Sequence, residues 1–243
     1  MKKLIEGAGK LGIELNARQV RQFELYYQEL IEWNKKINLT AITDYFSVQV
    51  KHFLDSLTIA LALSEEEVER PDFNIIDIGT GAGFPGVPLK ILFSQPRLVL
   101  IEPTTKKTAF LHHIIRRLEL ENVEVLDSRA EEAAHLPLYR EQFALVLSRA
   151  VALLPTLVEL TLPFCQIGGR FIAQKKGEIN QEINGAKEAI AALGGKLDHI
   201  KKIELDEFNE ERYLVIIGKI YPTPSKYPRR PGLPKRRPIK EVK

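Results

Sequence analysis

The feature that most limits how this chain can fold is a change of pattern at Asn74. From there, short apolar runs rich in β-branched residues alternate with amphipathic segments of helical length. This alternation is typical of an α/β fold, because parallel strands need crossover connections and apolar helices on both faces of the sheet. We expect strands at 74–78, 97–101, 123–126, 143–148, 169–173, 199–205 and 212–220, and helices at 85–93, 105–118, 154–162 and 178–193. No helix separates the last two strands, so one of them should join antiparallel at an edge.

The residues before Asn74 predict helices without strands. Apolar side chains at helical spacing mark an amphipathic helix within 13–34, with Asn16 as its N-cap, and a second helical stretch follows at 45–63. An acidic run and Pro71 then indicate a boundary. The predicted organisation is a helical extension (1–70), an α/β core (71–221) and a C-terminal tail (222–243).

Three alternate glycines, Gly79, Gly81 and Gly83, directly follow the first expected strand. An open α/β sheet binds its ligand at this position, where glycine lets backbone amides approach closely. A dinucleotide is one candidate, because Gly81, Gly83 and Gly86 fit the G-x-G-x-x-G spacing, and it would make the protein a nicotinamide oxidoreductase. However, the Asp77 carboxylate would repel a pyrophosphate. The cationic S-adenosyl-L-methionine suits an acid followed by glycines better.

Polar residues also follow the next three expected strands. Glu102 ends the second and can accept hydrogen bonds from both ribose hydroxyls, although a plain surface acid is the alternative. The segment 127–131 should line an adenine pocket or form a solvated loop. Arg149 follows the fourth strand, where the acceptor would meet the transferred group, and it could contact substrate or cofactor.

The charge of the chain is uneven. Residues 225–243 carry eight Lys or Arg against one Glu, whereas the rest of the chain is net acidic. Such a tail favours a polyanion, and we expect RNA, with a solubilising terminus as the alternative. Six prolines between Pro222 and Pro238 predict that this end of the chain is extended, without a helix, along a surface. Further candidate RNA contacts are Lys35, Lys36, Lys106, Lys107, Arg116, Arg117, Lys175 and Lys176.

Several classes of protein are disfavoured. The single cysteine, Cys165, lies in an apolar run and is expected to be a buried structural thiol, and the five histidines lack the spacing of a zinc site. No metal is therefore expected. The N-terminus does not resemble a secretory signal, and the most apolar window, 151–167, is too short and too interrupted to cross a membrane. We expect a cytoplasmic monomer.

Taken together, the motifs resemble one family, the bacterial 16S ribosomal RNA guanine-N7 methyltransferases known as RsmG or glucose-inhibited division protein B. The resemblance covers nearly the whole chain. It depends on segments 33–40, 52–56, 77–88, 102–107, 129–131, 148–150 and 175–177, and on the basic proline-rich run 226–234. The residues from Lys240 to Lys243 are less recognisable.

The resemblance implies a class I S-adenosylmethionine-dependent methyltransferase fold, a Rossmann-like sheet preceded by helices. It implies cofactor contacts at Gly79, Phe84, Glu102, Pro103, Thr104, Ala130, Glu131 and Arg149, beside the Asp77 and Gly81 of the glycine loop. The implied partner is 16S ribosomal RNA or the small ribosomal subunit.

Guanine N7 carries a lone pair and no proton, so this chemistry requires positioning and no general base. The target guanine should lie in a loop or distorted region, because side chains cannot reach N7 in the deep groove of an RNA helix. His52 and Asp55 are three residues apart and could share a helix face near the cofactor or serve only structurally. A non-catalytic RNA or ribosome binder that keeps the pocket remains the second alternative.

Overall fold

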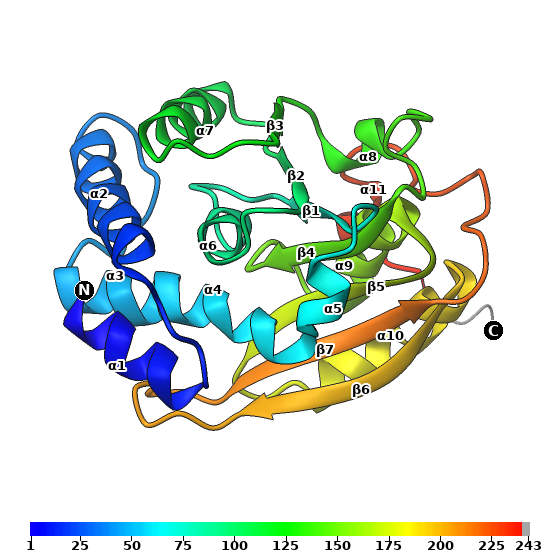
Figure 1. Cartoon of the computed structure of the whole chain (residues 1–243). Helices are drawn as coiled ribbons and strands as arrows, with labels where there is room; N and C mark the ends of the chain where they lie inside the picture. Colours follow the sequence, from blue (N-terminus) through cyan, green and yellow to red (C-terminus); the bar gives the residue numbers. More distant parts are fainter. Residues whose placement is uncertain (240–243) are drawn as a thin grey trace.

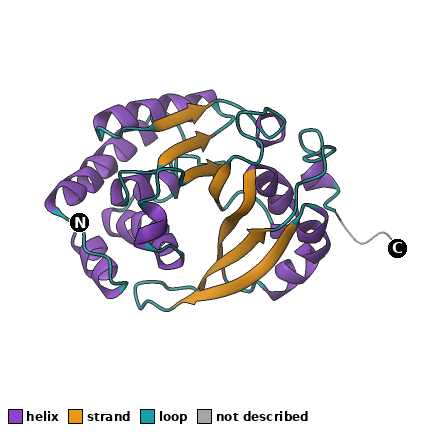
Figure 2. Ribbon diagram, turned by 45° about the vertical axis from the view of Figure 1, so that its right-hand side comes forward, coloured by secondary structure: helices purple, strands orange, loops and turns teal. Residues whose placement is uncertain are grey.

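A seven-stranded sheet runs through the computed structural model, which describes residues 1–239, and helices cover both of its faces (Figures 1 and 2). The strands are β1 (Asn74–Ile78), β2 (Arg97–Ile101), β3 (Val123–Leu126), β4 (Phe143–Arg149), β5 (Cys165–Lys176), β6 (Gly195–Ile203) and β7 (Arg212–Lys219). Each expected strand is present. The fifth and sixth begin four residues earlier than predicted, and the fifth also ends later.

The strand order is β3-β2-β1-β4-β5-β7-β6. Strands β1 to β5 pair in parallel, whereas β7 runs antiparallel to both β5 and β6. The predicted antiparallel pairing at an edge is confirmed by β6. The sequence did not show that β7 lies between β5 and β6.

Alternate residues of each strand enter different hydrophobic cores. On β1, Ile75 packs into one core, and Ile76 and Ile78 pack into the other. Helices α6 (Gly86–Leu92) and α7 (Thr105–Arg117) contribute to the first core, while α8 (Ala130–Ala133), α9 (Leu154–Thr161) and α10 (Asn180–Ala192) cover the opposite face. Because both faces are covered, the central strands are apolar along almost their entire length.

The N-terminal helices pack on the same face as α6 and α7. They are α1 (Lys2–Lys10), α2 (Ala17–Asn34), α3 (Tyr45–Val48), α4 (Asp55–Leu57) and α5 (Glu65–Val68), with a π-helical segment at Gln49–Leu54 and a 3₁₀ segment at Thr58–Ala62. Asn16 caps α2 as predicted, because its side chain accepts a hydrogen bond from the Gln19 amide and the Gln19 side chain accepts one from the Asn16 amide. Phe23, Tyr26 and Leu30 are the buried residues of α2. They tie this helix into the first core.

The C-terminal tail follows β7 and packs against α8 and α9. Its prolines lead part of it along the surface, but the expectation that it contains no helix is wrong: α11 (Leu233–Arg236) is one short helical turn. Pro234 is accommodated in the first turn of this helix, where a backbone N–H has no intrahelical partner to lose. The weakly recognised residues from Lys240 onward lie outside the described part of the chain.

Two further sequence expectations, on the cysteine and on membrane-spanning helices, can be compared with the structure. Cys165 is fully buried at the start of β5, as predicted, and burial raises the pKa of its thiol to about 12. Among the described residues, no helix combines the length and the apolar character that a membrane span needs.

Candidate functional site

The glycine loop after β1 requires glycine at each alternate position. Gly79, Gly81 and Gly83 have φ angles of 69°, 61° and 96°, in the left-handed region that disfavours other residues. A Cβ atom on Gly79 would stand 2.7 Å from Val151 Cγ2, and one on Gly83 would stand 2.7 Å from Tyr26 Oη. The loop therefore combines tight turns with close approach of its neighbours.

Asp77, at the end of β1, holds this loop through hydrogen bonds. Its Oδ2 accepts hydrogen bonds from Thr80 Oγ1 at 2.6 Å and from the Gly86 amide at 2.9 Å. Its Oδ1 is buried without a hydrogen-bond partner in the described part of the protein. Burial raises the pKa of Asp77 to about 6. Asp77 thus ties the strand end to the start of α6 and keeps one unpaired acceptor.

Glu102 joins the ends of β1 and β2. Its side chain is almost fully buried, and its Oε2 accepts a hydrogen bond from the Gly81 amide at 3.0 Å. Its Oε1 accepts one from the Thr104 amide at 3.1 Å, and Lys107 Nζ lies 3.9 Å from the same oxygen. The carboxylate is therefore held at the carboxyl edge of the sheet by two loop amides. Pro103, between Glu102 and Thr104, is exposed.

Phe84 lies in an aromatic stack. Its ring is 4.6 Å from the ring of His52 at an interplanar angle of 17°, and 5.3 Å from that of Tyr26 at 18°. The Arg149 guanidinium carbon lies 5.1 Å from the centroid of Phe84. Tyr26 also donates a hydrogen bond to the Ala82 carbonyl at 2.5 Å. The N-terminal helices therefore help to shape the loop.

Asp55 connects two arginines that are far apart in the sequence. Arg149 Nη1 donates to Asp55 Oδ2 at 2.9 Å, and Arg212 Nε donates to Oδ1 at 3.1 Å. Arg149 Nη2 lies 3.3 Å from His52 Nδ1, and His52 Nε2 lies 2.7 Å from Thr40 Oγ1. Burial and then the positive charge of Arg149 lower the pKa of His52 to about 3. A neutral His52 therefore accepts from Arg149 through Nδ1 and donates to Thr40 through Nε2.

A hollow of about 580 Å³ opens beside this cluster. Its walls come from the N-terminal helices, from the ends of β4 and β5, and from the turn that leads into β7. Gln174 donates to the Asp55 carbonyl at 2.5 Å and so secures the wall between β5 and α4. The residues that line it include His52, Asp55, Arg149, Gln174, Lys175 and Arg212.

The structure distributes the predicted site residues over one edge of the sheet. Gly81, Glu102 and Thr104 are joined by direct hydrogen bonds, and Phe84 and Arg149 are in contact. Asp77 is bonded instead to Thr80 and Gly86 of the same loop. Ala130 and Glu131 begin α8, which follows β3. The Glu131 carboxylate accepts a hydrogen bond from the tail, at the Gly232 amide, at 3.0 Å.

Sequence reasoning did not single out Tyr26 or Arg212. Tyr26 stood among the periodic apolar residues of a helix, so its hydroxyl gave no separate signal. Arg212 began an expected strand like any solvated charge. Only the pairing of β7 with β5 brings it to Asp55.

The candidate RNA-contacting cations differ in their surroundings. Five are ion-paired: Lys35 with Glu32, Lys107 with Glu102, Arg117 with Glu29, Lys175 with Glu182 and Lys176 with Glu210. Lys36, Lys106 and Arg116 are exposed and form no ion pair with the described residues.

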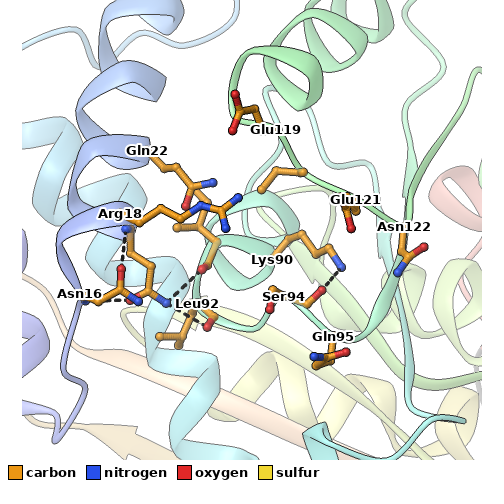
Figure 3. Close-up of a pocket in the computed structure, with 13 residues that line it drawn as sticks. Asn16, Arg18, Gln22, Lys90, Leu92, Ser94, Gln95, Glu119, Glu121 and Asn122 are labelled. Carbon is orange, nitrogen blue, oxygen red and sulfur yellow. Dashed lines mark hydrogen bonds between the residues drawn. The ribbon is translucent and has the colours of Figure 1, made fainter.

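A second hollow, of about 310 Å³, lies at the opposite end of the strands, between the start of α2 and the end of α6 (Figure 3). Lys90 points to the chain that leaves α6 and donates to the Ser94 carbonyl at 2.6 Å (Figure 3). It also donates to the Pro96 carbonyl at 2.6 Å. Burial lowers the pKa of Lys90 to about 8. Its ammonium group therefore stabilises the chain that follows α6. In an α/β sheet of this kind, ligands bind at the carboxyl edge of the strands.

Comparison with known proteins agrees with this geometry. Residues 19–213 match the family model described as GidB, rRNA small subunit methyltransferase G. A protein named ribosomal RNA small subunit methyltransferase G from Dehalococcoides mccartyi is 50% identical over 98% of this chain and 100% of its own, and its namesake from Roseiflexus castenholzii is 46% identical over the same shares.

Among solved structures, geranyl diphosphate C-methyltransferase from Streptomyces coelicolor, in complex with Mg²⁺, geranyl diphosphate and S-adenosyl-L-homocysteine, superimposes with a TM-score of 0.51. It is 14% identical, and the match covers 80% of this chain and 98% of that one. A Corynebacterium glutamicum protein also gives 0.51 at 19% identity, over 87% and 94% of the two chains. The expected class I methyltransferase fold is confirmed, and the chain belongs to the GidB family of rRNA small subunit methyltransferase G proteins.

Proposed function

We propose that this methyltransferase transfers a methyl group from S-adenosyl-L-methionine to N7 of a guanine in 16S ribosomal RNA. The observation that carries the proposal is the Glu102 carboxylate, fixed by the Gly81 and Thr104 amides at the carboxyl edge of the sheet. We also propose that the enzyme is cytoplasmic and acts as a monomer.

The residues at this edge fit the cofactor. Asp77 and Glu102 place two carboxyl groups around the glycine loop, and the segment 77–86 contains no Lys or Arg that could neutralise a pyrophosphate. Carboxylates attract a cation and accept hydrogen bonds from ribose hydroxyls, but they repel a pyrophosphate. They therefore suit a cationic nucleoside better than the dinucleotide of an oxidoreductase. The proposed cofactor contacts are Asp77, Gly79, Gly81, Phe84, Glu102, Pro103, Thr104, Ala130, Glu131 and Arg149. When bound, the cofactor supplies a methyl group activated by its sulfonium.

The chain's own residues would orient the base and exclude water. Guanine N7 holds an in-plane lone pair and no proton, so no side chain needs to act as a general base. Alignment of the reacting atoms can contribute about 7–11 kcal/mol to catalysis. The hollow beside Arg149 would hold the target base, while Asp55 and His52 fix the direction of the Arg149 guanidinium. His52 keeps this role at neutral pH because its pKa is about 3.

The RNA backbone would be bound by exposed cations around the same edge. Tail residues Lys226, Arg230, Lys235, Arg236 and Arg237 are exposed, whereas Arg229 forms an ion pair with Glu159. Replacing Lys235, Arg236 and Arg237 by alanine should lower the slope of log affinity against log salt by about two, if each contacts one phosphate. A filter-binding titration of 16S RNA at several salt concentrations measures this slope, and an unchanged slope would remove the tail from the RNA interface.

The deciding experiment uses the purified protein, small ribosomal subunits that lack the modification, and radioactive S-adenosyl-L-methionine. We expect the label in 16S RNA, and digestion with mass spectrometry should locate it as 7-methylguanine. A protein that binds the cofactor product but labels no RNA, free or assembled, would instead favour the non-catalytic binder.

A further inference from the structure

The C-terminal tail crosses the molecule from one end of the strands to the other. Because β7 is antiparallel to β5, it ends beside the amino half of β5, where Gly218 pairs with Arg170. The tail then turns back and reaches α8, which follows the carboxyl end of β3 (Figure 1). We call residues 222–237 the strap.

Partly buried polar contacts hold the strap along this path. At its beginning, Arg140 donates to the carbonyls of Thr223 and Tyr227, both at 2.9 Å. Further along, His135 Nε2 lies 2.8 Å from the Pro228 carbonyl oxygen. Three backbone carbonyls of the strap are therefore held by side chains of the segment that follows α8.

The strongest anchor is the ion pair between Arg229 and Glu159. Glu159 lies on α9 with no exposed surface, and its carboxylate accepts hydrogen bonds from the Arg229 amide at 2.9 Å, from Nε at 2.8 Å and from Nη2 at 2.6 Å. Without Arg229, a buried carboxylate would lose its counter-charge, which is strongly unfavourable. The position of the strap at α9 is therefore fixed tightly.

Three residues beyond this anchor, the strap reaches the candidate cofactor site. The Gly232 amide donates to Glu131 Oε1 at 3.0 Å, and Gly232 has a φ of 79°, in the left-handed region. Glu131 lies in the first turn of α8, directly after Ala130. Glu131, one of the proposed cofactor contacts, is therefore held by the strap through its carboxylate.

We propose that the strap is a positioning element of the cofactor site, which docks through Arg229 and Glu159 and orients the Glu131 carboxylate through the Gly232 amide. This inference rests on the proposed cofactor function. It makes strap docking and cofactor binding mutually favourable, because each stabilises the same conformation of Glu131, and such coupling is reciprocal. Tail residues would then support binding of the methyl donor as well as binding of RNA.

Gly232 offers a selective test. A Cβ there would meet no atom within 4 Å, so Gly232→Ala changes only the backbone preference at this position. The left-handed conformation disfavours alanine, and relaxing it would pull the amide from Glu131. We expect the Kd for S-adenosyl-L-homocysteine, measured by calorimetry, to rise about fivefold or more. Gly232→Asn should retain most of the affinity, because asparagine tolerates positive φ.

Gly12 supplies a matched control. It follows α1, has a φ of 75° and likewise has open space around it. Gly12→Ala should lower thermal stability as much as Gly232→Ala does, with no change in the Kd for the cofactor product. If both variants keep the wild-type Kd, the strap is only structural and the inference is wrong.

The Arg229 anchor supplies a second test. Replacing Arg229 and Glu159 together by methionine removes the ion pair without leaving an unpaired buried charge. We expect weaker product binding from this folded double variant, whereas Arg230→Ala, at the exposed neighbouring position, should bind as the wild type does. A double variant with unchanged Kd would contradict the inference.

The reciprocal effect can be measured in the wild-type protein. Saturating S-adenosyl-L-homocysteine should slow hydrogen exchange in residues 227–234 several-fold, but should leave exchange around Gly12 unchanged. Equal exchange of the strap with and without the compound would also contradict the inference. Failure of the wild type to bind the compound would sink the proposed function instead, so the two failures are distinguishable.

Discussion

The two ends of the sheet both carry hollows lined by polar residues, yet the polar groups are used differently. At the amino end, Lys90 and Gln19 donate to main-chain carbonyls that terminate α6 or follow it. At the carboxyl end, Asp55 is shared by Arg149 and Arg212, and these three side chains still line the space. A polar hollow alone therefore does not indicate a binding site. The charged groups must be held by one another and also face the cavity.

Among variants that test this comparison, Asp55→Ala is expected to have the largest effect on stability and activity. The change leaves Arg149 and Arg212 without their shared partner, and breaking a buried ion pair costs about 3–5 kcal/mol. Urea unfolding should detect this loss, and methyl transfer should fall with it. Asp55→Asn, which keeps the shape and can accept a hydrogen bond, should recover part of the stability. A stable, fully active alanine variant would show that the cluster does not orient Arg149.

Glu102→Ala should have the next largest effect, on cofactor binding. Hydrogen bonds to a charged group contribute about 1.5–3 kcal/mol, so the Kd for S-adenosyl-L-homocysteine should rise at least tenfold. Glu121→Ala, at the hollow of the amino end, is the control and should leave the Kd unchanged. Equal affinity of the two variants would move the cofactor site away from β2.

The acid dependence of stability sharpens the comparison further. The pKa of His52 falls from 6.5 to about 3 on folding, so its contribution is complete above pH 6.5 and decreases as the pH falls toward 3. The pKa of Asp77 rises from 3.8 to about 6, so folding takes up a proton and stability decreases as the pH rises from 3.8 to 6. The two effects oppose each other.

His52→Gln should therefore lose less stability than the wild type between pH 7 and pH 5, by about 2 kcal/mol at about 1.4 kcal/mol per pH unit. Asp77→Asn should lose more than the wild type between pH 6 and pH 4. Urea unfolding at each pH measures both. Parallel pH profiles for all three proteins would show that these groups titrate alike in the folded and unfolded states.

The smallest effect is expected at the amino end. Gln19→Ala removes one half of the capping box and the bonds to the Ile91 and Leu92 carbonyls, which should cost about 1–2 kcal/mol of stability. Thermal unfolding measures this loss. The Kd for the cofactor product and the methylation rate should not change at a temperature where the variant is folded. A change in either would give this hollow a functional connection.

Local patterns predicted much of the fold. Periodicity located the strands. Asn16 indicated the start of α2 because a capping box involves only four consecutive residues. The short helix α11 was missed because six prolines argued against any helix, although a proline in the first turn is compatible with one. The site was predicted in part for a similar reason: the glycine loop and Glu102 follow strands directly, whereas Tyr26 and Arg212 reach the site from distant segments.

By itself, the sequence determined the parallel sheet, the loop at its carboxyl edge and the acids around that loop, because each depends on neighbouring residues and on the fixed periods of strand and helix. The tertiary structure alone decided that β7 lies between β5 and β6, that Asp55 joins two arginines, and that the tail reaches Glu131. These contacts join residues as far as 157 positions apart, and no local pattern records which distant charges will share one buried partner.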